Sequence, residues 1–327
     1  MIAIIAEKPS VGMDIARVVG ADTRNDGYCS GNGYMVTWAL GHLVSLAMPD
    51  TYGYTKTAAE DLPMLPEPFR LVSRQVRTDR GMVTDIAASK QLKVIESVFN
   101  RCDSIIVATD CAREGELIFR WIYDFLGCTK PFRRLWISSL TDEAIRKGLE
   151  ELKDGSEYDS LYAAADSRAK ADWLVGINAT RLFSVLYHKT LTVGRVQTPT
   201  LKMLVDRDAK ILRFQKEKYY TVGIHSGSLK ADSGRIADAE TANSLKEKCT
   251  GANAVCTSIR REKKAEQPPK LYDLTTLQRE ANRLFGYTAK QTLDYAQSLY
   301  EKKLLTYPRT DSRYLTSDMA ETVSCVI

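Results

Sequence analysis

A tyrosine and an arginine near the end of the chain have side chains suited to a phosphodiester. The stretch LLTYPRTDSRYL places Tyr307 two residues before Arg309, with Pro308 between them. Proline blocks a helix here, and in an extended segment the two side chains would point the same way. The phenol could act as a nucleophile, and the guanidinium could hold phosphate oxygens. An isolated TYPR sequence is also typical of a core tyrosine, so other parts of the chain must decide.

Charged side chains follow two short apolar runs, Ile2–Ala6 and Ser104–Thr109, which are typical of buried parallel strands. Sites in open α/β sheets lie beyond such strand ends. The carboxylates at these two ends repel one another, and Mg²⁺, which prefers oxygen ligands, would relieve the repulsion. Alternatively, Glu114 and Glu116 only favour a helix N-terminus, which leaves Asp110 unexplained. The charged residues concerned are Glu7, Lys8, Asp110, Arg113, Glu114 and Glu116.

A helical tract is followed by a turn that could bind a phosphate. Arg168, Asp172 and Gly176 are spaced four residues apart and share one helix face. The turn precedes a helix that should begin at Thr198, and an arginine before a helix N-terminus suits phosphate. A solvated helix face and an ordinary helix–helix turn are the alternatives. The residues of the turn are Gly194, Arg195, Val196, Gln197 and Thr198.

The elements that would position these residues form a multidomain chain. An alternating α/β pattern closes near residue 150, with Thr141 as the N-cap of its last helix. A strand is expected within Tyr34–Leu46, and two more, at 219–226 and 252–259, in a thin separate unit. A basic, proline-bearing connector and two amphipathic helices then lead to Tyr307. The predicted segments are 1–150 (α/β), 151–215 (helical), 216–270 (β-rich) and 271–327 (helical).

Composition permits a nucleic-acid partner without requiring one. The chain has 327 residues, 44% hydrophobic and 27% charged, with a net charge of +5. Such a balance is ordinary for globular proteins. Seven scattered cysteines without a CxxC pair argue against a zinc ribbon and a disulfide framework, and fit a reducing cytosol. No apolar run approaches the ~20 residues of a membrane span.

Four motifs in sequence resemble the landmarks of type IA DNA topoisomerases. They are IIAEKPSVGMDIARVVG, ATDCAREGELIFRW, VGRVQTPTL and LLTYPRTDS, and the EKPS opening resembles the bacterial topoisomerase III branch. The resemblance covers essentially the whole chain. It implies an α/β Toprim metal-binding domain (1–150), a helical DNA-groove segment (151–215), part of a β-rich arch (216–270) and the start of a helical, tyrosine-bearing domain (271–327).

The resemblance also implies a role for each motif residue. Tyr307 would attack single-stranded DNA to form a 5′-phosphotyrosine, and Arg309 would hold the scissile phosphate. Glu7 would protonate the leaving 3′-oxygen, and Lys8 would position the phosphate. The Mg²⁺ ligands would be Glu7, Asp110 and Glu114. The DNA-binding residues would be Arg168, Asp172, Gly176, Gly194, Arg195, Val196, Gln197, Thr198 and Arg309.

The implied reaction is cleavage, strand passage and religation without ATP. This reaction would relax negatively supercoiled DNA or decatenate DNA. The enzyme would be a cytoplasmic bacterial monomer that acts on single-stranded regions. The open alternatives are a Toprim nuclease or primase, which does not need the YPRT segment, and a catalytically inactive single-stranded DNA-binding fragment.

Two departures from the family pattern affect these expectations. The second aspartate of the acidic turn is replaced by Ala112, which removes one possible metal ligand. Family members also continue well beyond the position of Ile327, so we expect the N-terminal portion of a longer enzyme, which would relax supercoils poorly by itself.

Overall fold

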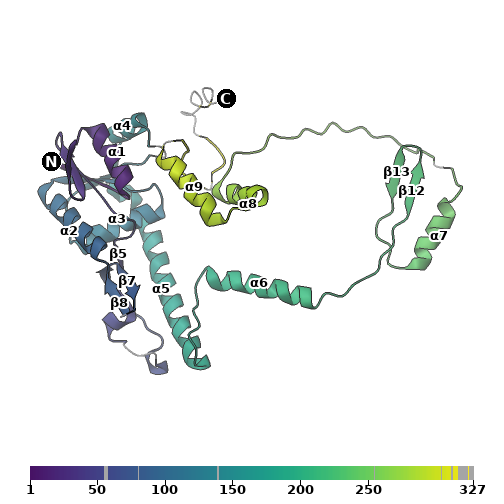
Figure 1. Cartoon of the computed structure of the whole chain (residues 1–327), viewed down its shortest axis with the longest axis horizontal. Coiled ribbons are helices and arrows are strands. Elements are labelled where there is room, and N and C mark those ends of the chain that lie inside the picture. The colour runs from purple at the N-terminus through teal and green to yellow at the C-terminus, as the bar shows by residue number, and fades with distance from the viewer. Residues whose placement is uncertain are drawn as a thin grey trace. The chain divides into compact units, whose positions relative to one another are not determined.

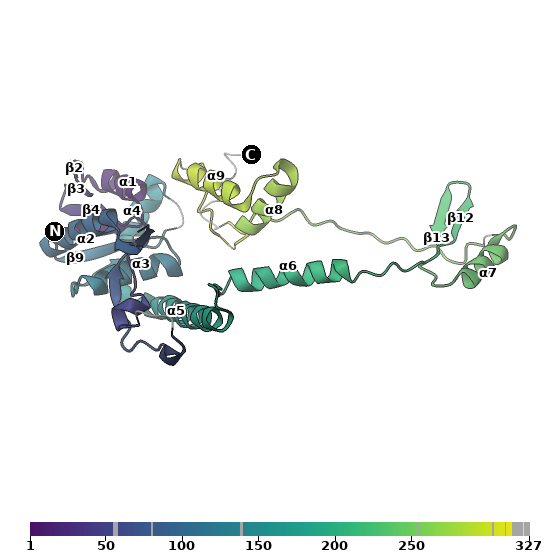
Figure 2. The same cartoon turned by 60° about the horizontal axis from the view of Figure 1, so that its bottom comes forward.

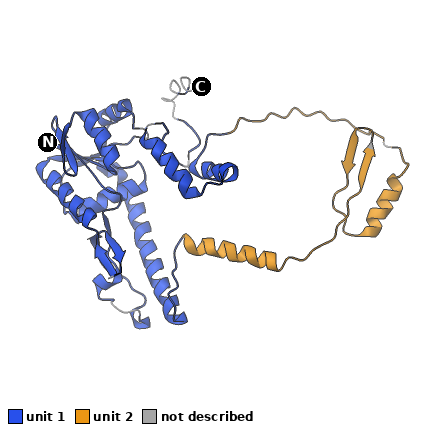
Figure 3. Ribbon diagram, viewed as in Figure 1, with its two compact units in different colours: residues 1–195, 270–327 blue, residues 196–269 orange. Residues whose placement is uncertain are grey.

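The computed structural model describes residues 1–54, 58–79, 81–137, 140–253, 255–302, 304–310, 312–315 and 323. The chain divides into two compact units (Figure 3). The first comprises Met1–Arg195 together with Lys270–Ile327, and the second is Val196–Pro269. All predicted catalytic residues belong to the first unit.

The first unit is built on a seven-stranded sheet with the order β11-β10-β9-β1-β4-β3-β2 (Figure 1). Its four central strands, β10, β9, β1 and β4, are parallel, and the outer strands are antiparallel. A parallel centre must be covered on both faces, which explains its nearly continuous apolar strands. The strands are β1 (Ile2–Ala6), β2 (Thr23–Asn25), β3 (Tyr28–Gly31), β4 (Tyr34–Trp38), β9 (Ser104–Ala108), β10 (Phe132–Arg134) and β11 (Lys153–Asp154).

Helices cover the two faces of this sheet in pairs. α1 (Pro9–Val19) and α4 (Asp142–Glu150) pack on the face of Ile4. α2 (Ile86–Arg101) and α3 (Arg113–Phe125) pack on the opposite face, that of Ile5. Successive strand residues point to opposite faces, so β1 contributes to both cores. The predicted α/β architecture of this part is confirmed.

Local sequence signals set the ends of these helices. Pro9 occupies the first turn of α1, and Gly20 ends the helix with a positive φ of 75°. The Asp85 carboxylate accepts bonds from the first amides of α2. Thr141 caps α4 by accepting a hydrogen bond from the Ala144 amide, as predicted.

Between β4 and α2 the chain leaves the main sheet. Where one strand is expected within Tyr34–Leu46, the structure has two, β4 and β5 (Val44–Leu46). They lie in different sheets, because Gly41 turns the chain between them with a φ of 68°. Two 3₁₀ helices, Pro49–Tyr52 and Ala59–Asp61, follow. β5 pairs with β6 (Leu71–Ser73), and β7 (Gln75–Thr78) pairs with β8 (Gly81–Thr84).

A long helix and a helical pair complete the first unit (Figure 2). A 3₁₀ turn (Gly155–Tyr158) leads into α5 (Asp159–Tyr187), which packs against α3. α8 (Leu274–Phe285) and α9 (Ala289–Glu301) confirm the two predicted amphipathic helices. Thr288 forms a capping box with Gln291 at the start of α9.

The second unit contains α6 (Gln197–Leu212), the hairpin of β12 (Gly223–Ser226) and β13 (Leu229–Asp232), and α7 (Ala239–Cys249). The prediction of a strand at 252–259 is wrong, because its described residues form no strand. Val255 and Ile259 are 78% and 83% exposed, so this segment has no partner surface to pair with. Among the described residues, no helix has the length and apolarity needed to span a membrane.

Candidate active site

The parallel pairing of β1 with β9 brings the two predicted acidic positions together. Ala6 is in register with Ala108, so the residues after both strands meet at one edge of the sheet. The backbone amide of Asp110 donates a hydrogen bond of 3.2 Å to a carboxylate oxygen of Glu7. Glu7 is buried and Asp110 is half-buried. Two neighbouring carboxylates therefore lie in a partly desolvated pocket.

Burial raises the pKa of Glu7 to about 7, and the negative charge of Asp110 adds to this effect. The hydrogen bond from the Asp110 amide and the charges of Lys8 and Arg309 oppose it. A carboxyl group that retains its proton near neutral pH is suited to donate that proton to a leaving oxygen.

We expect Glu7→Gln to stabilise the metal-free protein above pH 7. The unfolded state ionises near pH 4.5 and the folded state near pH 7. The wild type therefore loses stability relative to the variant as the pH rises through this window, by about 2–3 kcal/mol. Denaturant titrations in EDTA at several pH values measure the difference. Glu157→Gln, at an exposed position, is the control. A pH-independent difference between Glu7→Gln and the wild type would contradict the prediction.

Tyr307 lies against this acidic pair. Its hydroxyl donates a 2.8 Å hydrogen bond to a carboxylate oxygen of Asp110, which is 197 residues away in sequence. Its ring packs edge-on against Tyr300 of α9, with centroids 5.6 Å apart. Burial and the Asp110 charge raise the pKa of Tyr307, whereas Arg309 lowers it. The hydroxyl is thus held as a neutral phenol in the absence of DNA.

A cavity of about 800 Å³ opens beside the tyrosine. Asp110, Tyr307 and Arg309 line it, together with Cys111 and Ala112 of the acidic turn. The described residues 304–310 form bends and not an extended strand. Tyr307 and Arg309 therefore line the same cavity for a reason other than the expected alternation of side chains along a strand. The buried Pro308 separates them. The cavity gives a phosphodiester access to the phenol and a guanidinium together.

The acidic turn between β9 and α3 is tightly built. The Thr109 hydroxyl donates to the carbonyl of Gly115 at 2.7 Å. A Cβ at Gly115 would lie 2.1 Å from the Asp110 carbonyl oxygen, so only glycine fits. Ala112, the departure from the family pattern, is the N-cap of α3 and supplies no side-chain cap. Alanine in place of the family's aspartate therefore removes a possible helix cap as well as a possible metal ligand.

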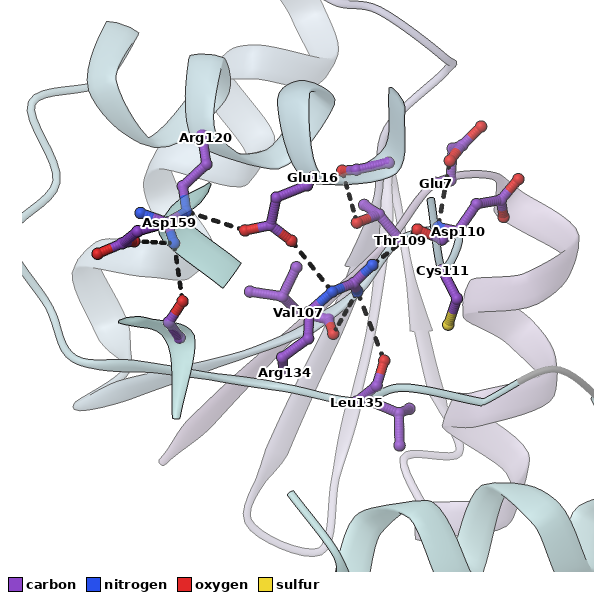
Figure 4. A network of polar contacts seen from close by, with 12 residues as sticks. Glu7, Val107, Thr109, Asp110, Cys111, Glu116, Arg120, Arg134, Leu135 and Asp159 are labelled. Carbon is purple, nitrogen blue, oxygen red and sulfur yellow. Dashed lines mark hydrogen bonds and ion pairs between the residues drawn. The ribbon is translucent and has the colours of Figure 1, made fainter. Parts of the chain in front are cut away.

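Beneath the turn lies a buried ion pair that the sequence did not indicate (Figure 4). Arg134 is 1% exposed and donates to the carbonyls of Val107 at 2.9 Å and Asp110 at 2.7 Å. Its Nε lies 3.2 Å from Glu116, a contact whose geometry is that of an ion pair and not of a hydrogen bond. Glu116 also accepts a hydrogen bond from Arg120 at 3.0 Å.

The suggestion that Glu116 could help to fill a metal shell does not fit this structure. Its carboxylate is fully buried against two arginines, Arg134 and Arg120, which neutralise it. Figure 4 shows it directed at Arg134, whereas Glu7 and Asp110 lie on the other side of the turn. Its role is to hold the arginine that binds the Asp110 carbonyl.

Glu114 is also separate from the Glu7–Asp110 pair. Its carboxylate contacts Arg168 of α5 at 3.3 Å and His42 at 3.3 Å. Within the part of the chain that the structure describes, no three metal-ligating side chains form a group that could hold an ion. Glu7 and Asp110 by themselves still fit Mg²⁺, which often takes one or two carboxylates and completes its shell with waters and substrate phosphate.

The two predicted DNA-binding arginines of this region, Arg168 of α5 and Arg195 after it, are paired with acids. Besides Arg168 with Glu114, Arg195 donates a 2.7 Å hydrogen bond to Asp172. A Cβ at Gly176 would make only an ordinary van der Waals contact, 3.6 Å from the Val193 carbonyl oxygen. Gly194 also belongs to the first unit, whereas Val196, Gln197 and Thr198 belong to the second and form the start of α6.

The chain matches known families along most of its length. Residues 2–140 match the Toprim domain, and residues 156–326 match the family described as DNA topoisomerase. DNA topoisomerase 3 of Shouchella clausii is 47% identical over 98% of this chain, and that of Bacillus subtilis is 43% identical over 98%. The chain spans 44% of the length of each of these relatives.

The fold agrees with the sequence matches. The structure of full-length topoisomerase I from Thermotoga maritima superposes with a TM-score of 0.65 at 24% identity, over 99% of this chain and 52% of that one. These comparisons confirm the resemblance to type IA enzymes of the topoisomerase III branch. The chain belongs to the DNA topoisomerase family.

Proposed function

We propose that this chain carries the DNA-cleaving site of a type IA topoisomerase of the topoisomerase III kind. The strongest support is the hydrogen bond between the Tyr307 hydroxyl and Asp110, which places a nucleophile at the acidic edge of a Toprim sheet. The whole protein would cleave one strand, pass another through the break and reseal it. The substrates would be single-stranded or negatively supercoiled DNA.

Each proposed catalytic side chain has a step in the cleavage. The Tyr307 oxygen attacks the scissile phosphorus and becomes linked to the 5′-phosphate end of the broken strand as a 5′-phosphotyrosine, and Asp110 is the proton acceptor that the phenol already contacts. Glu7 donates its proton to the departing 3′-oxygen. Arg309 and Lys8 provide positive charge for the pentacovalent phosphate. The covalent intermediate conserves the phosphoester bond energy, so religation needs no ATP.

A divalent cation, which we propose to be Mg²⁺, belongs beside these groups. Glu7 and Asp110 would hold it, and Glu114 could join them only after leaving Arg168 and His42. When bound, the ion supplies positive charge to the phosphate oxygens. Of the two carboxylates, Asp110 lines the same cavity as Tyr307 and Arg309.

The strand would run along α5 and the turn that follows it. We propose that Arg168 and Arg195 contact phosphates and that Gly176 and Gly194 allow the backbone to approach. Asp172 belongs to the same surface. Taken by themselves, Val196, Gln197 and Thr198 of the second unit are also proposed to bind phosphate, through the amides at the start of α6. In this scheme 1–150 is the metal-binding domain, 151–215 the groove, 216–270 part of an arch and 271–327 the beginning of the tyrosine domain, in a monomeric enzyme.

Covalent trapping tests the proposal. The chain is mixed with a single-stranded oligonucleotide and Mg²⁺, denatured at once, and analysed by gel and mass spectrometry for DNA linked to protein. An adduct on Tyr307 that requires the metal supports topoisomerase chemistry. Free cleaved DNA with no linked protein would instead indicate a Toprim nuclease, and binding without cleavage would indicate a DNA-binding fragment.

A further inference from the structure

Charges of alternating sign form a row along the proposed groove. Glu114, in the first turn of α3, contacts Arg168 of α5 at 3.3 Å. One helical turn further along α5, Asp172 accepts a hydrogen bond of 2.7 Å from Arg195. Arg168 and Arg195 both lower the pKa of Asp172, with the hydrogen bond from Arg195 as the largest cause. Arg168 and Arg195, the two arginines of the proposed groove, are therefore each already paired with a carboxylate.

These pairs differ from the buried pair beneath the active site. The side chains of Arg195 and Asp172 are 53% and 40% exposed, whereas Arg134 and Glu116 are each 1% exposed. Exposed ion pairs contribute only about 0.2–1 kcal/mol. A phosphate can therefore displace an exposed carboxylate at little cost, while a buried pair would stay closed.

We infer that Asp172 is a competitor for the DNA backbone, which holds Arg195 until a phosphate replaces it. This inference rests on the proposed function, and it gives Asp172 a role opposite to that of the other groove residues. The carboxylate keeps the arginine oriented and lowers the affinity of the groove for polyanions. Weak binding of the resting groove favours release of the strand after religation.

The inference predicts that removing the negative charge of Asp172 increases the affinity for single-stranded DNA. In Asp172→Asn, Arg195 meets a phosphate without first losing an ionic partner, so single-stranded DNA binds about two- to fivefold more tightly at low salt. In the wild-type complex the displaced Asp172 carboxylate stays near the phosphate and offsets part of its neutralisation. Removing that charge should therefore steepen the slope of log affinity against log salt by up to about 0.7.

Fluorescence anisotropy with a labelled oligothymidine, in EDTA and over a range of KCl concentrations, measures both quantities. The matched control is Asp142→Asn, because Asp142 forms a bidentate 2.7 Å pair with Arg17 between α1 and α4. A double variant, Asp172→Asn with Arg195→Gln, tests whether the gain requires Arg195.

We expect tighter, more salt-sensitive binding for Asp172→Asn only. Equal gains in the Asp142→Asn control or in the double variant would overturn the inference, since net charge alone would then explain them. Unchanged or weaker binding by Asp172→Asn would also overturn it while leaving the groove assignment intact. A wild type without salt-dependent binding would overturn the proposed DNA groove itself.

Discussion

Tyr307→Phe abolishes the covalent protein–DNA adduct, with a loss of at least about a thousandfold in trapped product. The substitution removes only the hydroxyl that donates to Asp110 and would attack the phosphorus, and it leaves the ring and its contact with Tyr300. Removing a nucleophile costs several powers of ten, because no other group occupies its position. The readout is the fraction of labelled oligonucleotide that remains linked to denatured protein in the presence of Mg²⁺.

Tyr300→Phe is the matched control for this experiment. Tyr300 is a neighbouring tyrosine in the same unit, with 8% exposure and a ring 5.6 Å from that of Tyr307. Since its hydroxyl is not the proposed nucleophile, the variant should retain the adduct. DNA still linked to Tyr307→Phe, or linked to another residue in the wild type, would refute the assignment of the nucleophile. Binding of the oligonucleotide by both variants shows that the groove is intact.

Arg134→Met lowers the free energy of unfolding of the first unit by about 3–5 kcal/mol. The change leaves Glu116 buried opposite a missing charge and removes the donors to the carbonyls of Val107 and Asp110. Glu116 keeps its hydrogen bond from Arg120 at 3.0 Å, but a buried carboxylate that loses one of its two cationic partners is more costly than an absent pair. The double variant Arg134→Met, Glu116→Leu should therefore recover part of the lost stability.

Tryptophan fluorescence during denaturant unfolding reports on the first unit alone. All four tryptophans, Trp38, Trp121, Trp136 and Trp173, lie in it. The control is Arg133→Met, which replaces the neighbouring, exposed arginine of β10. We expect it to change the free energy of unfolding by less than about 0.5 kcal/mol. A double variant no more stable than Arg134→Met would show that the loss of stability comes from the missing hydrogen bonds to the carbonyls, and not from the loss of one of the two arginine partners of Glu116.

Helix periodicity by itself indicates that Glu114 and Glu116 cannot both face the predicted metal site. Glu114 and Glu116 are two residues apart in α3, so their side chains leave the helix on nearly opposite sides. One is exposed and the other is fully buried. The same reasoning applies to Arg133 and Arg134, since adjacent strand residues face opposite ways. The periodicity of the helix and of the strand predicts that one member of each pair is buried. It does not predict which side chain the buried member contacts.

The sequence by itself determined the elements and the chemical groups they present. The apolar runs Ile2–Ala6 and Ser104–Thr109 predicted the two strands, and the residues after them predicted an acidic edge, because parallel strands end on one side of a sheet. Capping residues such as Thr141 marked the helix ends, because a cap acts within a few residues. These features depend on local interactions.

Only the tertiary structure decided which groups meet. The contact between Tyr307 and Asp110 joins residues 197 apart, and the pairing of Glu114 with Arg168 depends on the packing of α3 against α5. The described residues of the segment at 252–259 include strand-forming types but pair with no described neighbour, so their strand propensity did not produce a strand. Contacts over such separations depend on how faces pack, which a local pattern does not specify, and so the partner of each charged side chain had to come from the fold.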